Sequence, residues 1–142
     1  MNRTRFTEEE LRELFISSVF QNEDFYKEVP VFSRSVDLVH YDSKKRIITA
    51  IEFKMDNWRR AVQQALNVSM CFDYLAICIP EPKTKKCLNM IEEECSKYGI
   101  GIYLFNDRDL SFEHLCHETH ISNVWNKQKK SVIEYLEVMN NE

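Results

Sequence analysis

Glycine is unusually scarce in this chain. Only Gly99 and Gly101 occur among 142 residues, where average usage would give about ten. The GxGxxG loop of dinucleotide-binding proteins and the GxxxxGK[ST] loop of P-loop proteins both need glycines at spacings that these two do not provide. The sequence therefore excludes a Rossmann oxidoreductase and a P-loop NTPase, and we expect no nucleotide cofactor.

The chain also lacks a basic excess and a long apolar run. Its 19 Lys and Arg residues are outnumbered by 23 Asp and Glu residues, which gives a formal net charge of −4. Proteins that hold nucleic acid by bulk attraction usually have a pI above about 9, so this mode of binding is disfavoured. No apolar run approaches the roughly 18 residues of a membrane-spanning helix. We therefore expect no membrane partner.

Disulfide and zinc-ribbon signatures are missing as well. The five cysteines are an odd number and include no CxxC pair. The first residues are charged and run into Glu8-Glu9-Glu10, unlike the apolar core of a secretory signal. Reduced thiols and a cytoplasmic location are the expectation.

Apolar residues are plentiful, at 44% of the chain, and their spacing alternates between helical and strand periods. We expect one domain over residues 1–142. The pattern predicts helices over about 8–21, 57–71, 86–98 and 123–139, and strands over about 26–30, 36–41, 46–53, 74–79 and 102–105. Residues 106–121 look irregular. The order α-β-β-β-α-β-α-β-α predicts an α/β fold with a mixed β-sheet flanked by helices.

Three charged residues interrupt or end two apolar strands. Asp37 lies within Val36–Val39, and Glu52 and Lys54 fall at the end of RIITAIEF. Buried charges are unfavourable unless they are paired or bind a metal, so these residues indicate a functional site. Glu52 and Lys54 are two apart and share one face of the strand.

Strand register decides whether Asp37 joins them. A two-residue loop at Ser43-Lys44 would place Asp37 opposite Ala50 and diagonal to Glu52, on the same face. A three-residue loop would place Asp37 opposite Ile51, on the wrong face. We favour the two-residue register because it also puts Val36 and Leu38 with Ile51 and Phe53 on the other, apolar face.

Two carboxylates that converge from neighbouring strands suit Mg²⁺ or Mn²⁺. Such a cation can bind a phosphodiester oxygen and acidify a water, and a nearby lysine can hold that water or offset developing charge. The reaction class that this predicts is metal-assisted phosphodiester hydrolysis.

The motif formed by Asp37 and Glu52-Phe53-Lys54 resembles that of the PD-(D/E)XK nuclease superfamily, whose restriction-endonuclease-like core is α-β-β-β-α-β. Here an α-β-α extension would follow that core. The resemblance implies that Asp37, Glu52 and the Phe53 backbone carbonyl ligate Mg²⁺ or Mn²⁺, and that Lys54 assists the water. The following WRRAVQQA helix resembles the family's pattern and implies that Gln64 faces the site. The residue before Asp37 is Val36, where the family name has Pro.

Further residues follow from the same resemblance. Many members add a Glu from the first helix. On a helical wheel Glu8 lies nearest the apolar stripe, Glu10 is accounted for by a capping box with Thr7, and Glu13 points away, so Glu8 is the candidate. Arg59 and Arg60 could reach phosphate, although a solvated helix face is the commoner role of such residues. The implied partner is DNA, with modest and salt-dependent non-specific affinity.

Other interpretations of the sequence remain open. The same fold could serve as a non-catalytic module that binds nucleic acid or protein, although this leaves the Asp37, Glu52 and Lys54 set unexplained. A homodimer could form through the helix at 123–139. His114, Cys116, His117 and His120 invite a zinc site, but their spacing gives no second ligand pair, so a surface or packing cluster is favoured.

Overall fold

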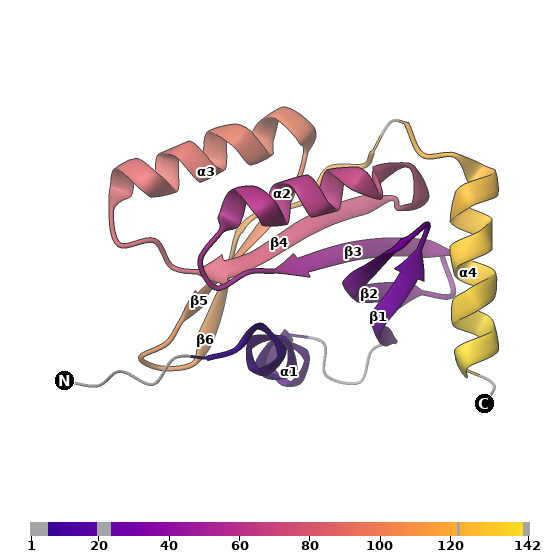
Figure 1. The fold of residues 1–142 in the computed structure, drawn as a ribbon, viewed down its shortest axis with the longest axis horizontal. Coiled ribbons are helices and arrows are strands. Elements are labelled where there is room, and N and C mark those ends of the chain that lie inside the picture. The colour runs from indigo at the N-terminus through magenta and orange to yellow at the C-terminus, as the bar shows by residue number, and fades with distance from the viewer. Residues whose placement is uncertain (1–5, 20–23, 122, 141–142) are drawn as a thin grey trace.

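The structure is a computed structural model that describes residues 6–19, 24–121 and 123–140. One six-stranded mixed sheet and four α-helices make up this part of the chain (Figure 1). In chain order the elements are α1 (Glu8–Val19), β1 (Phe25–Val31), β2 (Arg34–Asp42), β3 (Ile47–Phe53), α2 (Trp58–Asn67), the 3₁₀ turn η1 (Ser69–Cys71), β4 (Tyr74–Pro80), α3 (Lys85–Tyr98), β5 (Gly101–Asn106), β6 (Ser111–Cys116) and α4 (Asn126–Asn140).

The strands lie side by side in chain order, β1 to β6. β1, β2 and β3 form an antiparallel meander, and β3, β4 and β5 are parallel. α2 and α3 make the two crossovers between the parallel strands and lie together on one face of the sheet, while α1 lies on the other (Figure 1). The carboxyl ends of β3, β4 and β5 consequently meet at one edge of the sheet.

The core has two parts, separated by the sheet. The larger lies mainly under α2, α3 and α4 and includes Ala50, Leu75 and Ile133. The smaller lies under α1, where the Phe15 ring packs edge-on against Phe53 at 5.3 Å between ring centres. α1 is thus anchored directly beside the end of β3.

The α/β class and the mixed sheet agree with the sequence expectation, and the predicted helices and strands are present with ends shifted by a few residues. The predicted helix over 57–71 is instead α2, ending at Asn67, followed by η1. The prediction that 106–121 is irregular was wrong, because β6 covers Ser111–Cys116. β6 is an edge strand that is never fully buried, so its sequence carries no apolar run.

The predicted loop between the second and third strands was also wrong. Asp42 pairs with Ile47, so the turn contains residues 43–46 rather than two residues. Asp42 Oδ1 stabilises this turn by accepting from the Lys44 and Lys45 amides at 3.1 and 3.2 Å. Lengthening the loop by two residues leaves the facing of the side chains unchanged. Leu38, Ile51 and Phe53 lie together under α1 as expected, whereas Val36 packs in the larger core.

No helix in the described ranges is both long enough and apolar enough to span a membrane.

Candidate active site

The centre of the candidate site is Glu52, the second-to-last residue of β3. Its neighbours in the strand are apolar, and the Glu52 side chain itself is only 2% exposed. β3 is buried because β2 and β4 pair with it on either side and helices cover both faces. A carboxyl group at this position is deprived of water, so its partners decide its charge.

Asp37 of β2 supplies the nearest partner. The β2–β3 ladder pairs Leu38 with Ile51, and one further step places Asp37 directly opposite Glu52, rather than diagonal to it as the sequence predicted. Asp37 Oδ2 accepts a hydrogen bond from the Phe53 amide at 2.8 Å. The Asp37 and Glu52 carboxyl groups are also close enough for each to alter the pKa of the other.

This proximity changes the acidity of both groups. Burial, and then the charge of Asp37, raise the pKa of Glu52 to about 9. Burial also raises the pKa of Asp37, although the Phe53 amide and the hydrogen bond from Glu52 oppose the rise. At neutral pH the pair therefore holds a proton, which lies mainly on Glu52. A bound divalent cation would take the place of that proton.

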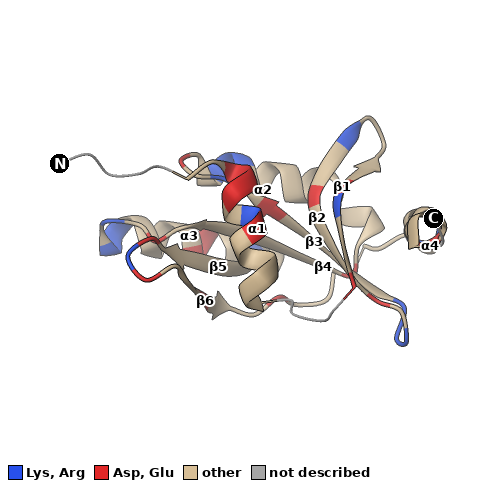
Figure 2. Ribbon diagram, turned by 90° about the horizontal axis from the view of Figure 1, so that it is seen from below, with Lys and Arg blue, Asp and Glu red and all other residues tan. Residues whose placement is uncertain are grey.

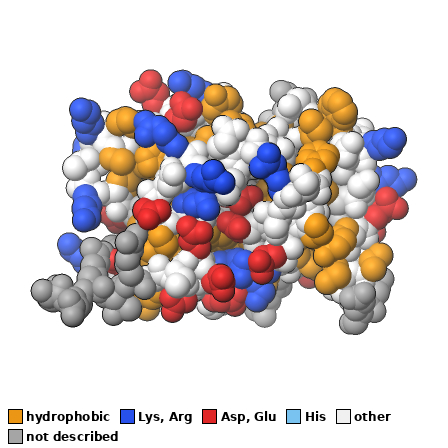
Figure 3. All heavy atoms as spheres, in the orientation of Figure 1, with side chains coloured by type: hydrophobic (Ala, Val, Ile, Leu, Met, Phe, Trp, Pro, Cys, Tyr) orange, Lys and Arg blue, Asp and Glu red, His pale blue; other side chains and the backbone are white. Residues whose placement is uncertain are grey.

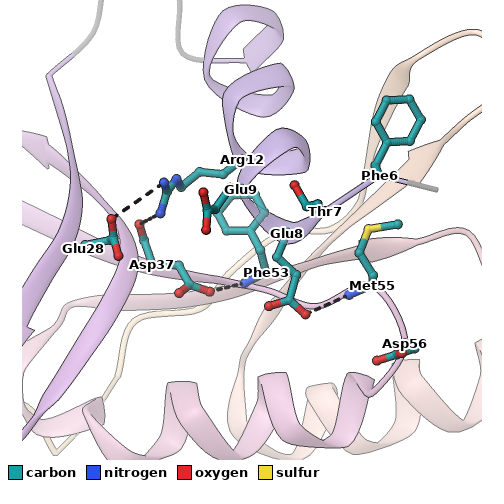
Figure 4. Close-up of a pocket in the computed structure, with 10 residues that line it drawn as sticks. All are labelled: Phe6, Thr7, Glu8, Glu9, Arg12, Glu28, Asp37, Phe53, Met55 and Asp56. Atoms are coloured by element: carbon teal, nitrogen blue, oxygen red, sulfur yellow. Dashed lines mark hydrogen bonds and ion pairs between the residues drawn. The ribbon is translucent and has the colours of Figure 1, made fainter. Parts of the chain in front are cut away.

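α1 brings a third carboxylate, Glu8, to the end of β3. Thr7 Oγ1 accepts from the Glu10 amide at 3.0 Å and the Thr7 amide donates to Glu10 Oε1 at 2.9 Å, which is the predicted capping box. With the helix start fixed, Glu8 Oε1 lies 3.6 Å from Lys54 Nζ and Glu8 Oε2 accepts from the Met55 amide at 3.4 Å. Figure 4 shows Glu8 and Asp37 at the same cavity, from two elements.

That cavity measures about 400 Å³ and lies between α1 and the ends of β2 and β3. Its charged lining is mainly acidic, and in Figure 2 the acidic segments of α1, β2 and β3 gather here. The exception is Arg12, a residue that the sequence did not single out. Its guanidinium donates to the Asp37 carbonyl at 3.4 Å and lies 3.9 Å from Glu28. An arginine on the first helix has no sequence signal that would separate it from a surface residue.

The carboxyl oxygens of Asp37 and Glu52 suit a divalent cation, whereas Glu8 has other partners. Asp37 and Glu52 are adjacent, hard oxygen donors that already share a proton, which is what a two-carboxylate Mg²⁺ or Mn²⁺ site needs. Glu8 is instead engaged by Lys54 and the Met55 amide. Within the described residues, no three His, Cys, Asp or Glu side chains form a ready-made metal-binding group.

The predicted residues of the following helix are less closely tied to the carboxylates. α2 begins four residues after Lys54, where Asn57 Oδ1 accepts from the Arg60 amide at 3.2 Å. Arg59 stacks on the Trp58 ring, with the guanidinium carbon 4.4 Å from the ring centre. Neither arginine lines the acidic cavity, and neither does the half-buried Gln64. Their roles therefore remain predictions.

Two of the three histidines lie together, since the His114 and His117 ring centres are 4.1 Å apart. His114 Nε2 lies 2.6 Å from Glu118 Oε1, whereas His120 Nε2 lies 3.3 Å from Asp73 Oδ1, so the two rings serve different carboxylates. Asp73 was missed by the sequence analysis although it is only 4% exposed. Its carboxylate accepts from the Ile48 amide at 2.9 Å and pairs with Lys129 of α4 at 2.8 Å. Both contacts hold segments far apart in the chain together.

Comparison with known proteins gives no relative. No protein-family model matches the chain, and no significant match was found among curated proteins or solved structures. The geometry described above is accordingly the basis for a functional proposal.

Proposed function

We propose that this chain is a metal-dependent nuclease domain that hydrolyses phosphodiester bonds in DNA, built on a restriction-endonuclease-like core. The core would comprise α1, β1, β2, β3, α2 and β4, and α3, β5, β6 and α4 would extend it. Support for the fold comes from the element order and from the antiparallel-then-parallel arrangement of the first four strands.

One observation carries the functional proposal. Asp37 and Glu52, two carboxyl groups from different strands, come together at the end of β3, immediately beside Lys54, and each alters the pKa of the other. Holding such a pair apart from water is unfavourable without a compensating role, and among the described residues Lys54 is the basic group whose charge acts on both carboxyl groups. A cation would satisfy both carboxylates.

In the proposed reaction Asp37, Glu52 and the Phe53 carbonyl would hold Mg²⁺ or Mn²⁺, which would supply charge neutralisation of the phosphate and a more acidic water. A water oxygen attacks phosphorus and loses a proton to solvent, the bond from phosphorus to the leaving sugar oxygen breaks, and that oxygen takes up a proton from solvent. Lys54 orients the water and offsets the growing negative charge. Glu8 positions Lys54 through their 3.6 Å ion pair.

The direct test is cleavage of linear, circular and branched DNA in Mg²⁺ or Mn²⁺, with EDTA as the blank. We expect Asp37→Asn, Glu52→Gln and Lys54→Ala each to lower the rate at least about 100-fold, since each removes a group that binds the metal or stabilises charge in the proposed reaction. Matched controls are Glu113→Gln, an exposed carboxyl group on β6, and Lys44→Ala at the opposite end of β3.

Equal cleavage by the wild type and all three site variants would overturn the proposal, because a contaminant would then be responsible. Absence of cleavage together with absence of any heat on Mn²⁺ titration would favour a non-catalytic binding module on the same fold.

A further inference from the structure

The edge where β3, β4 and β5 end carries more than the acidic cavity. A second cavity of about 210 Å³ shares Met55 and Asp56 with the first, and a third of about 450 Å³ shares Pro80, Glu81, Pro82 and Lys83 with the second. Shared walls make the three cavities neighbours along one edge of the sheet. They form a track that leads from the candidate site across the ends of the parallel strands.

The middle cavity differs from the others in chemistry. Its walls are mainly apolar or aromatic and are formed by Met55, Trp58, Ile79, Pro80, Pro82, Cys87 and Ile91. Lys54 and Lys83 are its basic residues, and Asp56 and Glu81 its acidic ones. Cavities that hold drug-sized ligands span roughly 300–1,000 Å³, so this one suits a smaller group, such as a single planar ring system.

The starts of the two helices that flank this cavity are one-sided in charge. α2 carries Arg59 and Arg60 and no acidic residue. Residues 82–91, which lead into and begin α3, carry three lysines, at positions 83, 85 and 86, and again no acidic residue. Figure 3 shows basic side chains over the part of the surface where α2 and α3 begin. An anionic chain would be attracted to both sides of the cavity.

We propose that the middle cavity binds an unpaired base of a nucleic-acid strand, whose backbone lies along the starts of α2 and α3. The inference rests on the proposed function in one respect, namely that the scissile phosphate lies beside Lys54. Lys54 lines this cavity, so a strand whose phosphate lies there can direct the neighbouring base inward. The preferred substrate is then single-stranded DNA or an unpaired stretch next to a duplex.

The physical reason is that a base within a duplex cannot enter an apolar cavity. Its faces are stacked and its edge is paired, whereas an unpaired base offers a planar face to Trp58 and the prolines. An apolar peptide side chain could fill the same volume. The five basic residues at the two helix starts favour a polyanion over such a peptide.

Tryptophan fluorescence tests binding separately from cleavage. The chain has two tryptophans, so Trp125→Phe leaves Trp58 as the single reporter. In that background, with Glu52→Gln and EDTA to prevent cleavage, we would titrate oligo(dT) of twelve nucleotides, a twelve-base-pair duplex and a short apolar peptide. We expect oligo(dT) to quench Trp58 and to bind at least tenfold more tightly than the duplex.

Two variants locate the binding. Cys87→Phe fills the cavity and should weaken oligo(dT) binding about tenfold or more, whereas Met90→Phe, on the same helix but outside the cavity lining, should not. Lys83→Ala, an exposed substitution that leaves the core intact, should weaken binding and reduce the salt slope by about one. Lys97→Ala, near the other end of α3, is its control.

The outcomes separate the two proposals. Equal binding of duplex and oligo(dT), quenching by the peptide alone, or wild-type affinity in both Cys87→Phe and Lys83→Ala would overturn the base-binding proposal and leave the nuclease proposal intact. Selective oligo(dT) binding that Cys87→Phe weakens, in a protein whose Asp37 and Lys54 variants cut DNA as fast as the wild type, would support the base cavity and overturn the nuclease proposal.

Discussion

Glu52 shows how a single buried carboxyl group can link folding to ligand binding. Burial and the adjacent Asp37 raise its pKa to about 9, against an ordinary value of 4.5. Between these two pH values the unfolded chain has an ionised Glu52 while the folded chain keeps it protonated. The free energy of unfolding therefore falls as the pH rises through this window, because the native state binds more protons.

The first prediction concerns the Glu52→Gln variant. Glutamine cannot ionise, so at pH 8 and without divalent metal we expect the variant to be more stable than the wild type by up to about 5 kcal/mol, because pH 8 lies about 3.5 units above the ordinary pKa and each unit is equivalent to about 1.4 kcal/mol. The difference should shrink toward pH 5. Urea unfolding at both pH values measures it, with Glu113→Gln as the control. A wild-type stability that is independent of pH over this window would contradict the assigned acidity.

The second prediction concerns the proton that Asp37 and Glu52 share. Mn²⁺ binding at pH 7 should release about one proton, and the affinity should rise with pH, because cation and proton compete for the same oxygens. Calorimetric titration in two buffers of different ionisation enthalpy measures the released proton. Glu52→Gln should abolish the release, whereas Glu9→Gln, which changes a carboxyl group that lines the acidic cavity beside Asp37, should retain it. Binding without proton release would place the cation elsewhere.

At the scale of the elements, α1 and β3 are fixed relative to each other by independent contacts. Phe15 packs on Phe53 inside the small core, and Glu8 reaches Lys54 and the Met55 amide outside it. The Thr7 cap sets where the helix begins and hence where Glu8 lies. The start of α1 is thus part of the candidate site as well as of the fold.

The third prediction is that Thr7→Ala lowers stability and cleavage together. Loss of an N-cap usually costs about 1 kcal/mol. We expect the frayed first turn to release Glu8 from Lys54 and to lower the cleavage rate several-fold. Gly99→Ala is the matched control, because Gly99 ends α3 at a φ of 68° and an added Cβ would meet Thr119, away from the site. Comparable loss of activity in both variants would show that stability alone matters.

α4 has an apolar side that the described residues leave exposed. Val132, Ile133 and Leu136 are buried against the core, whereas Tyr135, Val138 and Met139 are exposed. Pairing of two copies through the 123–139 region stays a prediction, and sedimentation measures it.

At the scale of the whole molecule, Asp73 joins parts of the chain that are distant in sequence. Its side chain contacts the Ile48 amide, His120 and Lys129, while its backbone carbonyl accepts from the Ile121 amide at 2.8 Å. These contacts bind β3 and the segment before α4 to the turn that precedes β4. Asp73 is buried and charged, so its ion pair with Lys129 compensates a large desolvation.

The fourth prediction is that Lys129→Ala lowers the free energy of unfolding by about 2–4 kcal/mol, since it leaves Asp73 buried without its closest cation. Lys130→Ala, the exposed neighbour on the same helix, should change it by less than about 0.5 kcal/mol. Urea unfolding distinguishes them. Equal stability of the two variants would mean that water or His120 replaces Lys129.

The net charge of −4 is a sum over the whole molecule, in which acidic and basic groups lie in different places. Acidic groups gather at the candidate site, while the starts of α2 and α3 are basic. Lys44, Lys45 and Arg46, which flank the motif in sequence, lie in the β2–β3 turn at the far end of β3 from Lys54. An overall acidic balance is thus compatible with a local surface that attracts a polyanion.

The sequence by itself determined the elements and the unusual residues. Apolar periodicity located nine of the elements, Gly99 marked the end of α3, and charges inside apolar strands singled out Asp37, Glu52 and Lys54. These features are local, because each depends on a few neighbouring residues and on which side of an element is buried.

Only the tertiary structure decided which side chains meet. The direct pairing of Asp37 with Glu52 depends on a four-residue turn whose length the sequence did not reveal. The approach of Glu8 to Lys54, the ion pair of Asp73 with Lys129 and the edge strand β6 depend on how distant elements pack. Apolar periodicity indicates that one side of a helix or strand is buried, but it does not indicate which residues bury it. Contacts between remote segments are therefore known only once the sheet has formed.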